Sequence, residues 1–238
     1  MRLPFLPVFL SGAISIQTAA TAAETRLWAS YAELHAVFAK FNDMPAASRS
    51  RILFHLNAKP PAGIARPEEI RLAIASRSGL RPIVIDRDWR LDFPVENGLL
   101  KENPNIFTSL ERGTPLVLRP QITLVPLPGL VWPLADLARG VDQANAAVRS
   151  QAGVFSLFAP KAKAVTLRFA QQGVSVRVKT SRGENIIRAA ANGEVELPLD
   201  NQLAKSGATI HLPFPPREVA PRFKMTMSLT TEQDEKSR

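Results

Sequence analysis

The chain has 238 residues, of which 45% are apolar and 21% charged, enough apolar material to bury the core of one or two domains. Thirty Lys and Arg against 21 Asp and Glu give a net charge of +9, which favours anionic partners. The absence of Cys excludes disulfides, thiol catalysis and Cys-ligated metal sites.

Residues 1–22 have the layout of a secretory signal peptide. Arg2 precedes an apolar run from Leu3 to Ile16, and small residues follow this run. The run is too short for a membrane-spanning helix, so we expect cleavage near Ala22 or Ala23 and no anchoring. No later stretch is apolar for long enough to cross a bilayer. The sequence therefore predicts a periplasmic protein whose mature chain has no transmembrane segment.

Residues 23–128 are predicted to form the first unit, which opens with a helix. Apolar residues recur at helical spacing from Leu27 to Asn42. Extended segments follow, several of them with apolar residues at every second position. They are Arg51–Asn57, Ile70–Ser76, Pro82–Asp86, Trp89–Val95, Pro115–Leu118 and Gln121–Val125.

Residues 129–223 are predicted to form the second unit, after a boundary at the Pro- and Gly-containing segment Pro126–Val131. A helix is expected from Pro133 to Ser150, with one apolar stripe. The expected strands are Ala164–Ala170, Val174–Thr180, Asn185–Ala190, Glu194–Leu197 and Thr209–Leu212. Residues 224–238 are polar and charged, and we expect them to form a disordered tail.

The chain is similar to itself at a shift of 104 residues. Over residues 70–108, seven pairs are identical, among them Gly79 with Gly183 and Pro94 with Pro198. Both copies keep an apolar residue at every second position, which is typical of half-buried strands. The predicted fold class is thus α+β and strand-dominated, with two duplicated antiparallel β-sandwich-like units, each preceded by an α-helix.

The sequence contains no recognisable catalytic or metal-binding pattern. His35, His55 and His211 do not stand at metal-ligand spacing, and there is no Gly-rich phosphate loop, so we predict no cofactor. Asp86, Asp88 and Glu96 are the carboxylates that a hydrolase would use. Asp86 and Asp88 flank a predicted turn, where Asp is common for backbone reasons, so the sequence favours a structural role for them.

Basic residues cluster in both units, and an anion-binding surface is one interpretation of them. The candidate binding residues are Arg71, Arg87, Arg90, Arg177 and Lys179. Arg177 and Lys179 alternate with valines, so they are expected to share the solvent face of one strand. A solvated sheet face is the alternative. Nucleic acid is not expected as a partner, because export removes the protein from the cytoplasm and few aromatic residues accompany the charge.

The segments Leu91-Asp92-Phe93-Pro94 and Val195-Glu196-Leu197-Pro198, each followed by Asn97 or Asn201, resemble those of exported proteobacterial proteins of unknown function. The resemblance covers residues 24–223 and implies a periplasmic location without catalytic residues. The first hypothesis is a non-enzymatic periplasmic binding or protein-interaction module that presents a basic surface to an anionic envelope polymer or an envelope protein. The alternatives are a cell-envelope hydrolase that uses carboxylates and a structural scaffold subunit.

Overall fold

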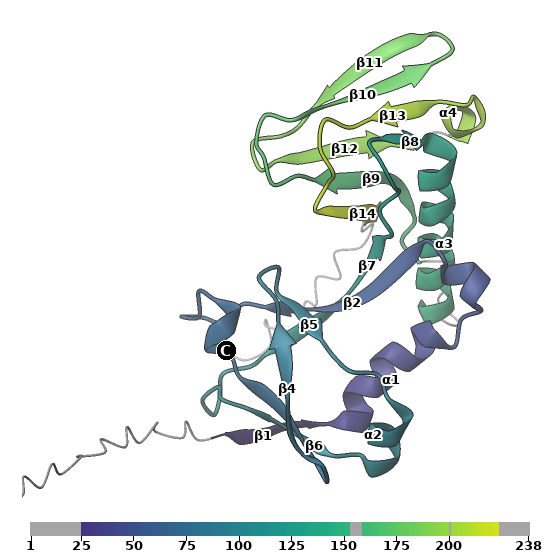
Figure 1. Ribbon diagram of the computed structural model, residues 1–238. Coiled ribbons are helices and arrows are strands. Elements are labelled where there is room, and N and C mark those ends of the chain that lie inside the picture. The colour runs from purple at the N-terminus through teal and green to yellow at the C-terminus, as the bar shows by residue number, and fades with distance from the viewer. Residues whose placement is uncertain (1–24, 153–158, 200, 224–238) are drawn as a thin grey trace, which may run out of the picture.

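The computed structural model describes residues 25–152, 159–199 and 201–223. In this part of the chain the protein is a strand-dominated α+β fold of three antiparallel sheets, arranged in two lobes (Figure 1). The predicted signal peptide and the predicted polar tail lie outside the described residues. None of the helices within the described ranges combines the length and apolar character that a bilayer crossing requires.

Seven strands of the first half form one curved sheet, a half-barrel. They are β1 (Arg26–Ser30), β2 (Ile52–Lys59), β3 (Leu72–Ser76), β4 (Gly79–Ile85), β5 (Arg90–Asp92), β6 (Asn105–Thr108) and β7 (Val117–Leu124). Their order in the sheet is β1-β6-β3-β4-β5-β2-β7. Because β4 pairs with β5 and β5 with β2, the ladder is continuous, and the first half is not divided into the two packed sheets of a sandwich.

The helix of the first half, α1 (Tyr31–Asn42), begins later than the apolar spacing predicts. Residues 26–30 are extended instead, because they pair with β6 at the edge of the sheet. Ser30 caps the helix: its hydroxyl accepts from the Glu33 amide, and the Glu33 carboxylate accepts from the Ser30 amide. Tyr31, Leu34 and Phe38 then pack into the core of the half-barrel. This core also takes alternate residues of β3, as the period of two predicts.

The second half contains two smaller sheets. Its strands are β8 (Val131–Pro133), β9 (Ala162–Arg168), β10 (Ser175–Thr180), β11 (Gly183–Arg188), β12 (Glu194–Pro198), β13 (Thr209–His211) and β14 (Glu218–Phe223). One sheet has the order β11-β10-β13-β8 and the other β12-β9-β14. The predicted strands are found, whereas β8 and β14 lie in segments for which the sequence predicted no strand.

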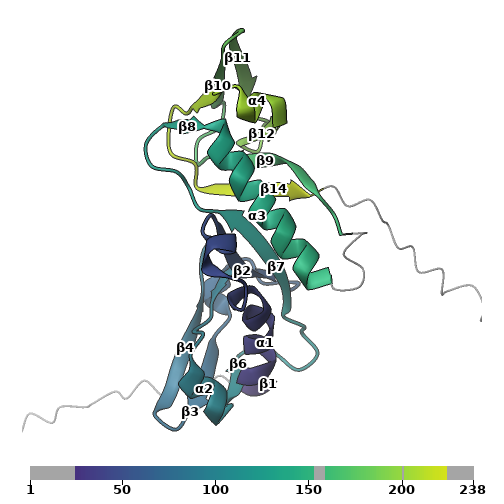
Figure 2. The same ribbon diagram turned by 90° about the vertical axis from the view of Figure 1, so that its right-hand side faces the viewer.

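Short helices complete both halves: η1 (Ala46–Arg49), η2 (Pro67–Glu69) and α2 (Asn97–Glu102) in the first, α4 (Asn201–Lys205) in the second. The long helix α3 (Leu134–Ala152) begins one residue later than predicted. Leu134, Leu137, Val141 and Ala144 of its apolar stripe are buried. α3 packs on β9 of its own half and on β2 and β7 of the first half, so it joins the two lobes (Figures 1 and 2).

The two lobes also meet through strands, since β7 and β14 lie side by side. Each of these strands is the edge of its sheet, and each contains a proline, Pro120 or Pro221. Proline lacks the N–H that an interior strand needs, so it is compatible with an edge position. The junction between β7 and β14 positions the candidate functional site.

Candidate functional site

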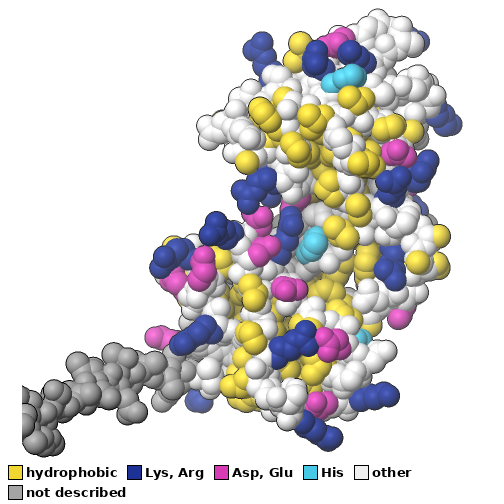
Figure 3. Space-filling model, viewed as in Figure 1, with side chains coloured by type: hydrophobic (Ala, Val, Ile, Leu, Met, Phe, Trp, Pro, Cys, Tyr) yellow, Lys and Arg dark blue, Asp and Glu magenta, His cyan; other side chains and the backbone are white. Residues whose placement is uncertain are grey.

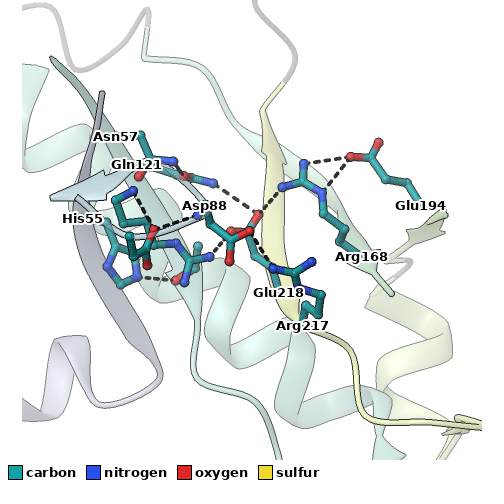
Figure 4. A network of polar contacts seen from close by, with 11 residues as sticks. His55, Asn57, Asp88, Gln121, Arg168, Glu194, Arg217 and Glu218 are labelled. Carbon is teal, nitrogen blue, oxygen red and sulfur yellow. Dashed lines mark hydrogen bonds and ion pairs between the residues drawn. The ribbon is translucent and has the colours of Figure 1, made fainter. Parts of the chain in front are cut away.

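A buried carboxylate, that of Glu218, holds the two halves together at the start of β14. Its side chain is 7% exposed. One oxygen pairs with the Arg90 guanidinium of β5. The other accepts from Nη1 of Arg168 on β9, at 3.3 Å, and from Nε2 of Gln121 on β7, at 3.4 Å (Figure 4). Arg168 belongs to the same half as Glu218, whereas Arg90 and Gln121 belong to the first half, so docking of the lobes adds a second cation and an amide donor to this buried charge.

Two further ion pairs flank Glu218. Arg168 also binds Glu194 of β12, at 2.8 Å, and Arg217 binds Asp88 of the first half, at 2.8 Å. The hydrogen bond from Arg168 lowers the pKa of Glu194 below its ordinary value. On the face shown in Figure 3, Lys or Arg and Asp or Glu side chains alternate where the two lobes meet. The junction is thus a polar network of opposite charges.

The polar network continues along β2. Nε2 of His55 lies 2.9 Å from Oγ1 of Thr123, and Nδ2 of Asn57 donates to Oε1 of Gln121. Burial lowers the pKa of His55, and the positive charge of Arg90 lowers it further. The neutral imidazole is therefore favoured beside this cation. Asn57 Oδ1 and Arg90 Nε are buried without a hydrogen-bond partner among the described residues.

An apolar groove of about 440 Å³ adjoins the network, and Gln121 belongs to both. The first half supplies walls from α1, β2 and β7, including Phe41, Phe54 and Ile122. The second half supplies walls from α3 and β14, including Val148, Pro221 and Phe223. Its volume is within the range of small-molecule sites, which often lie between domains. The groove can take an apolar chain or ring.

Exposed cations lie within one residue of the lining of the apolar groove. Arg119 neighbours Pro120, Arg149 neighbours Val148, and Lys161 neighbours Pro160. None of the three makes an ion pair with the residues that the structure describes. These three cations are therefore uncompensated, which favours a ligand with an anionic group.

The structure does not gather the five predicted binding residues onto one surface. Arg90 is in the network at the junction, with 22% of its side chain exposed. Arg71, just before β3, and Arg87, in the turn between β4 and β5, are both exposed. Arg177 and Lys179 share the solvent face of β10, as predicted, and both pair with Glu184. The role of all five residues in anion binding remains a prediction.

The three candidate hydrolase carboxylates each interact with different partners. Asp86 accepts hydrogen bonds from the backbone amides of Asp88 and Arg90 and so shapes the turn after β4. Asp88 pairs with Arg217, and Glu96 pairs with Arg81 at 2.6 Å. None of these carboxylates lines the apolar groove. Among the described residues, no group of three His, Asp or Glu side chains is placed to hold a metal ion.

Sequence reasoning missed Glu218, Gln121 and the apolar groove. The partners in the network stand far apart in the chain, since Arg90 and Glu218 are separated by 128 positions. A local pattern does not report such contacts. One signal was present, since the larger apolar residues Val219, Pro221 and Phe223 alternate with Glu218, Ala220 and Arg222. That period of two would have placed β14 and its first residue, Glu218.

No protein-family model matches this chain, and comparisons with curated proteins and with solved structures likewise gave no match. The resemblance to exported proteobacterial proteins rests on its two short segments alone.

Proposed function

We propose that the mature chain is a non-enzymatic periplasmic binding module that holds an anionic amphiphile in the apolar groove between two copies of one unit. The copies would span residues 26–124 and 131–223. If the strands of each half are numbered from its own start, the first half has the order 1-6-3-4-5-2-7. The second half has 1-6-3-4 and 5-2-7. This agreement in order supports a duplication.

Backbone conformation supports the duplication independently. Trp89 and Asn103 are the non-glycine residues with positive φ in the described chain. At a shift of 104, glycines with positive φ take both places, Gly193 and Gly207. Glycine adopts this conformation without strain, whereas other residues rarely do. The same unusual turn and helix end thus recur at corresponding positions.

Hydrogen bonds recur at the same shift. The Ser76 hydroxyl donates to the Gly79 carbonyl at 3.0 Å, and the Thr180 hydroxyl donates to the Gly183 carbonyl at 3.1 Å. In the next turn, the Asp86 amide donates to the Arg90 carbonyl, and Ala190 donates to Glu194 in the same way. These are irregular positions, where a chance match of partner and spacing is uncommon.

The observation that carries the binding function is the apolar groove, because both halves wall it and it would not exist in either half alone. An acyl chain or aromatic ring would bury apolar surface there, at about 25 cal/mol per Å². Arg119, Arg149 and Lys161 would attract an acidic headgroup. The ligand class is therefore an anionic amphiphile, consistent with an envelope component.

Ligand binding is tested with a fluorescent fatty acid, 11-(dansylamino)undecanoic acid, and the mature chain. We expect saturable binding that weakens about tenfold when Val148→Trp fills the groove, a loss of about 1.4 kcal/mol. Val131→Trp, at a side chain that is 52% exposed on β8, is the matched control and should bind as the wild type does. Equal affinities in all three proteins would rule out the groove as the site.

Export is a separate part of the proposal and rests on the signal peptide of residues 1–22. We expect the mature chain in periplasmic extract, with Ala23 or Glu24 at its N-terminus. Intact mass measurement after cell fractionation checks this. A cytoplasmic protein that still carries residues 1–22 would contradict it.

A further inference from the structure

One edge of β11 is unpaired in the described structure, whereas the corresponding strand of the first half, β4, has a neighbouring strand on both sides. In the first half, β4 pairs with β5 through Val84 with Asp92 and Ile85 with Leu91. The corresponding strands, β11 and β12, belong to different sheets, and each is an edge strand. Among the strands that the structure describes, β11 pairs with β10 alone, so main-chain groups on its other side have no strand partner there.

Successive residues of a strand direct their backbone amides and carbonyls to opposite sides, and this alternation shows which residues of β11 face the open edge. The Ala189 amide donates to the Val174 carbonyl, beyond the end of β10. Alternate residues therefore face β10, and the residues between them, including Ile186 and Arg188, direct their amides and carbonyls to the open edge. The Ala190 amide, which donates to Glu194 on β12, has the same direction.

The residue at the centre of this edge differs between the two halves. Ile186 corresponds to Pro82 of β4 at the shift of 104. Pro82 has no N–H, so it blocks strand addition at this position of the first half. Ile186 has the N–H, and its side chain is 57% exposed. The second half therefore lacks the protection that the first half has.

The surroundings of the edge specify the partner. A cavity of about 420 Å³ lies beside it, and its charged lining residues are Arg188, Arg222, Glu194 and Glu196. Glu196 pairs with Arg222 and Glu194 pairs with Arg168, so these two carboxylates are already compensated. Arg188 makes no ion pair with the described residues. On the same sheet face, Arg177 and Lys179 share the one carboxylate of Glu184. The edge is thus basic with one exposed apolar side chain.

We propose that β11 binds an extended acidic segment of a partner protein as an added strand. Such a segment would form main-chain hydrogen bonds with Ile186 and Arg188, which provide affinity without requiring one sequence. A carboxylate beside Arg188 and an apolar side chain beside Ile186 would provide selectivity. This site is separate from the apolar groove, and the proposal does not depend on a ligand there.

The test uses a short fluorescein-labelled peptide in which valine alternates with glutamate and threonine, together with the mature chain. We expect binding by fluorescence anisotropy, and a loss of about tenfold or more in Ile186→Pro, which introduces the proline of the first half. Pro82→Ile is the matched control and should leave binding unchanged. The same peptide with lysine in place of glutamate should bind more weakly, because the edge is basic.

A second readout covers the case in which Ile186→Pro does not fold. Peptide binding to the wild type should slow amide hydrogen exchange at Ile186 and Arg188 by about tenfold, with no change at Ile187, which faces β10. Unchanged exchange at the edge, or equal affinity in Ile186→Pro, overturns the proposal. So does dimerisation of the chain through this edge that Ile186→Pro abolishes, since the occupant would then be a second copy.

Discussion

Replacing Trp132 with alanine is expected to lower the free energy of unfolding by about 3–5 kcal/mol. The indole is 1% exposed and lies in the core of the second half. Trp132 pairs with Ile210 across β8 and β13, and its Nε1 donates to the Gly129 carbonyl at 2.9 Å. Alanine would leave a cavity and an unpaired carbonyl. Urea denaturation followed by circular dichroism measures the change.

The matched control for Trp132→Ala is Val131→Ala on the same strand. Val131 is 52% exposed, so its truncation should change the free energy of unfolding by no more than about 0.5 kcal/mol. A loss below about 1 kcal/mol in Trp132→Ala would show that the second half repacks around the missing ring, and it would contradict a well-packed core at this position.

Replacing Glu218 with alanine is expected to cost about 3 kcal/mol, because one partner of a buried pair is left without its counter-charge. The Arg90 side chain is 22% exposed and would remain buried beside the neutral His55. Arg168 keeps Glu194 and is 51% exposed, so its share of the cost is small. Urea denaturation measures the total cost.

Two variants separate the pair from a general surface effect. Glu196→Ala removes a carboxylate that pairs with Arg222 and is 45% exposed, and it should cost no more than about 1 kcal/mol. The double variant Arg90→Met with Glu218→Leu removes both charges and should recover most of the stability lost in Glu218→Ala. If the double variant recovers no stability, the unpaired charge of Arg90 is not the cause of the stability lost in Glu218→Ala.

Periodicity predicted the elements whose burial is local. In β10, Val176 and Val178 are buried while Arg177 and Lys179 are exposed, because a single strand with one covered face determines that pattern. The start of α1 was predicted wrongly, since Leu27 fits the helical spacing but pairs with Phe107 of β6. This pairing depends on a strand about eighty residues away, which local spacing does not report.

The site was less predictable than the fold, for the same reason. Arg90 was a candidate for a basic surface, yet its partner Glu218 comes from a strand that the sequence did not predict. The apolar groove is assembled from α1, β2, β7, α3 and β14, and each of these contributes residues that would fit an ordinary core. The groove forms only where the two halves meet, so the residues of one half do not reveal it.

The contact between β7 and β14 has a consequence for the origin of the chain. Under the proposed duplication these two strands are equivalent, each the last strand of its copy. An interface in which the same element of two copies meets is isologous, the arrangement of a twofold homodimer. Under the proposed duplication the tandem would correspond to a dimer joined into one polypeptide, in which a short linker keeps each half at a high effective concentration. Under the same proposal the joined halves would be free to differ, as they do where β4 is closed by β5 and β11 is not closed by β12.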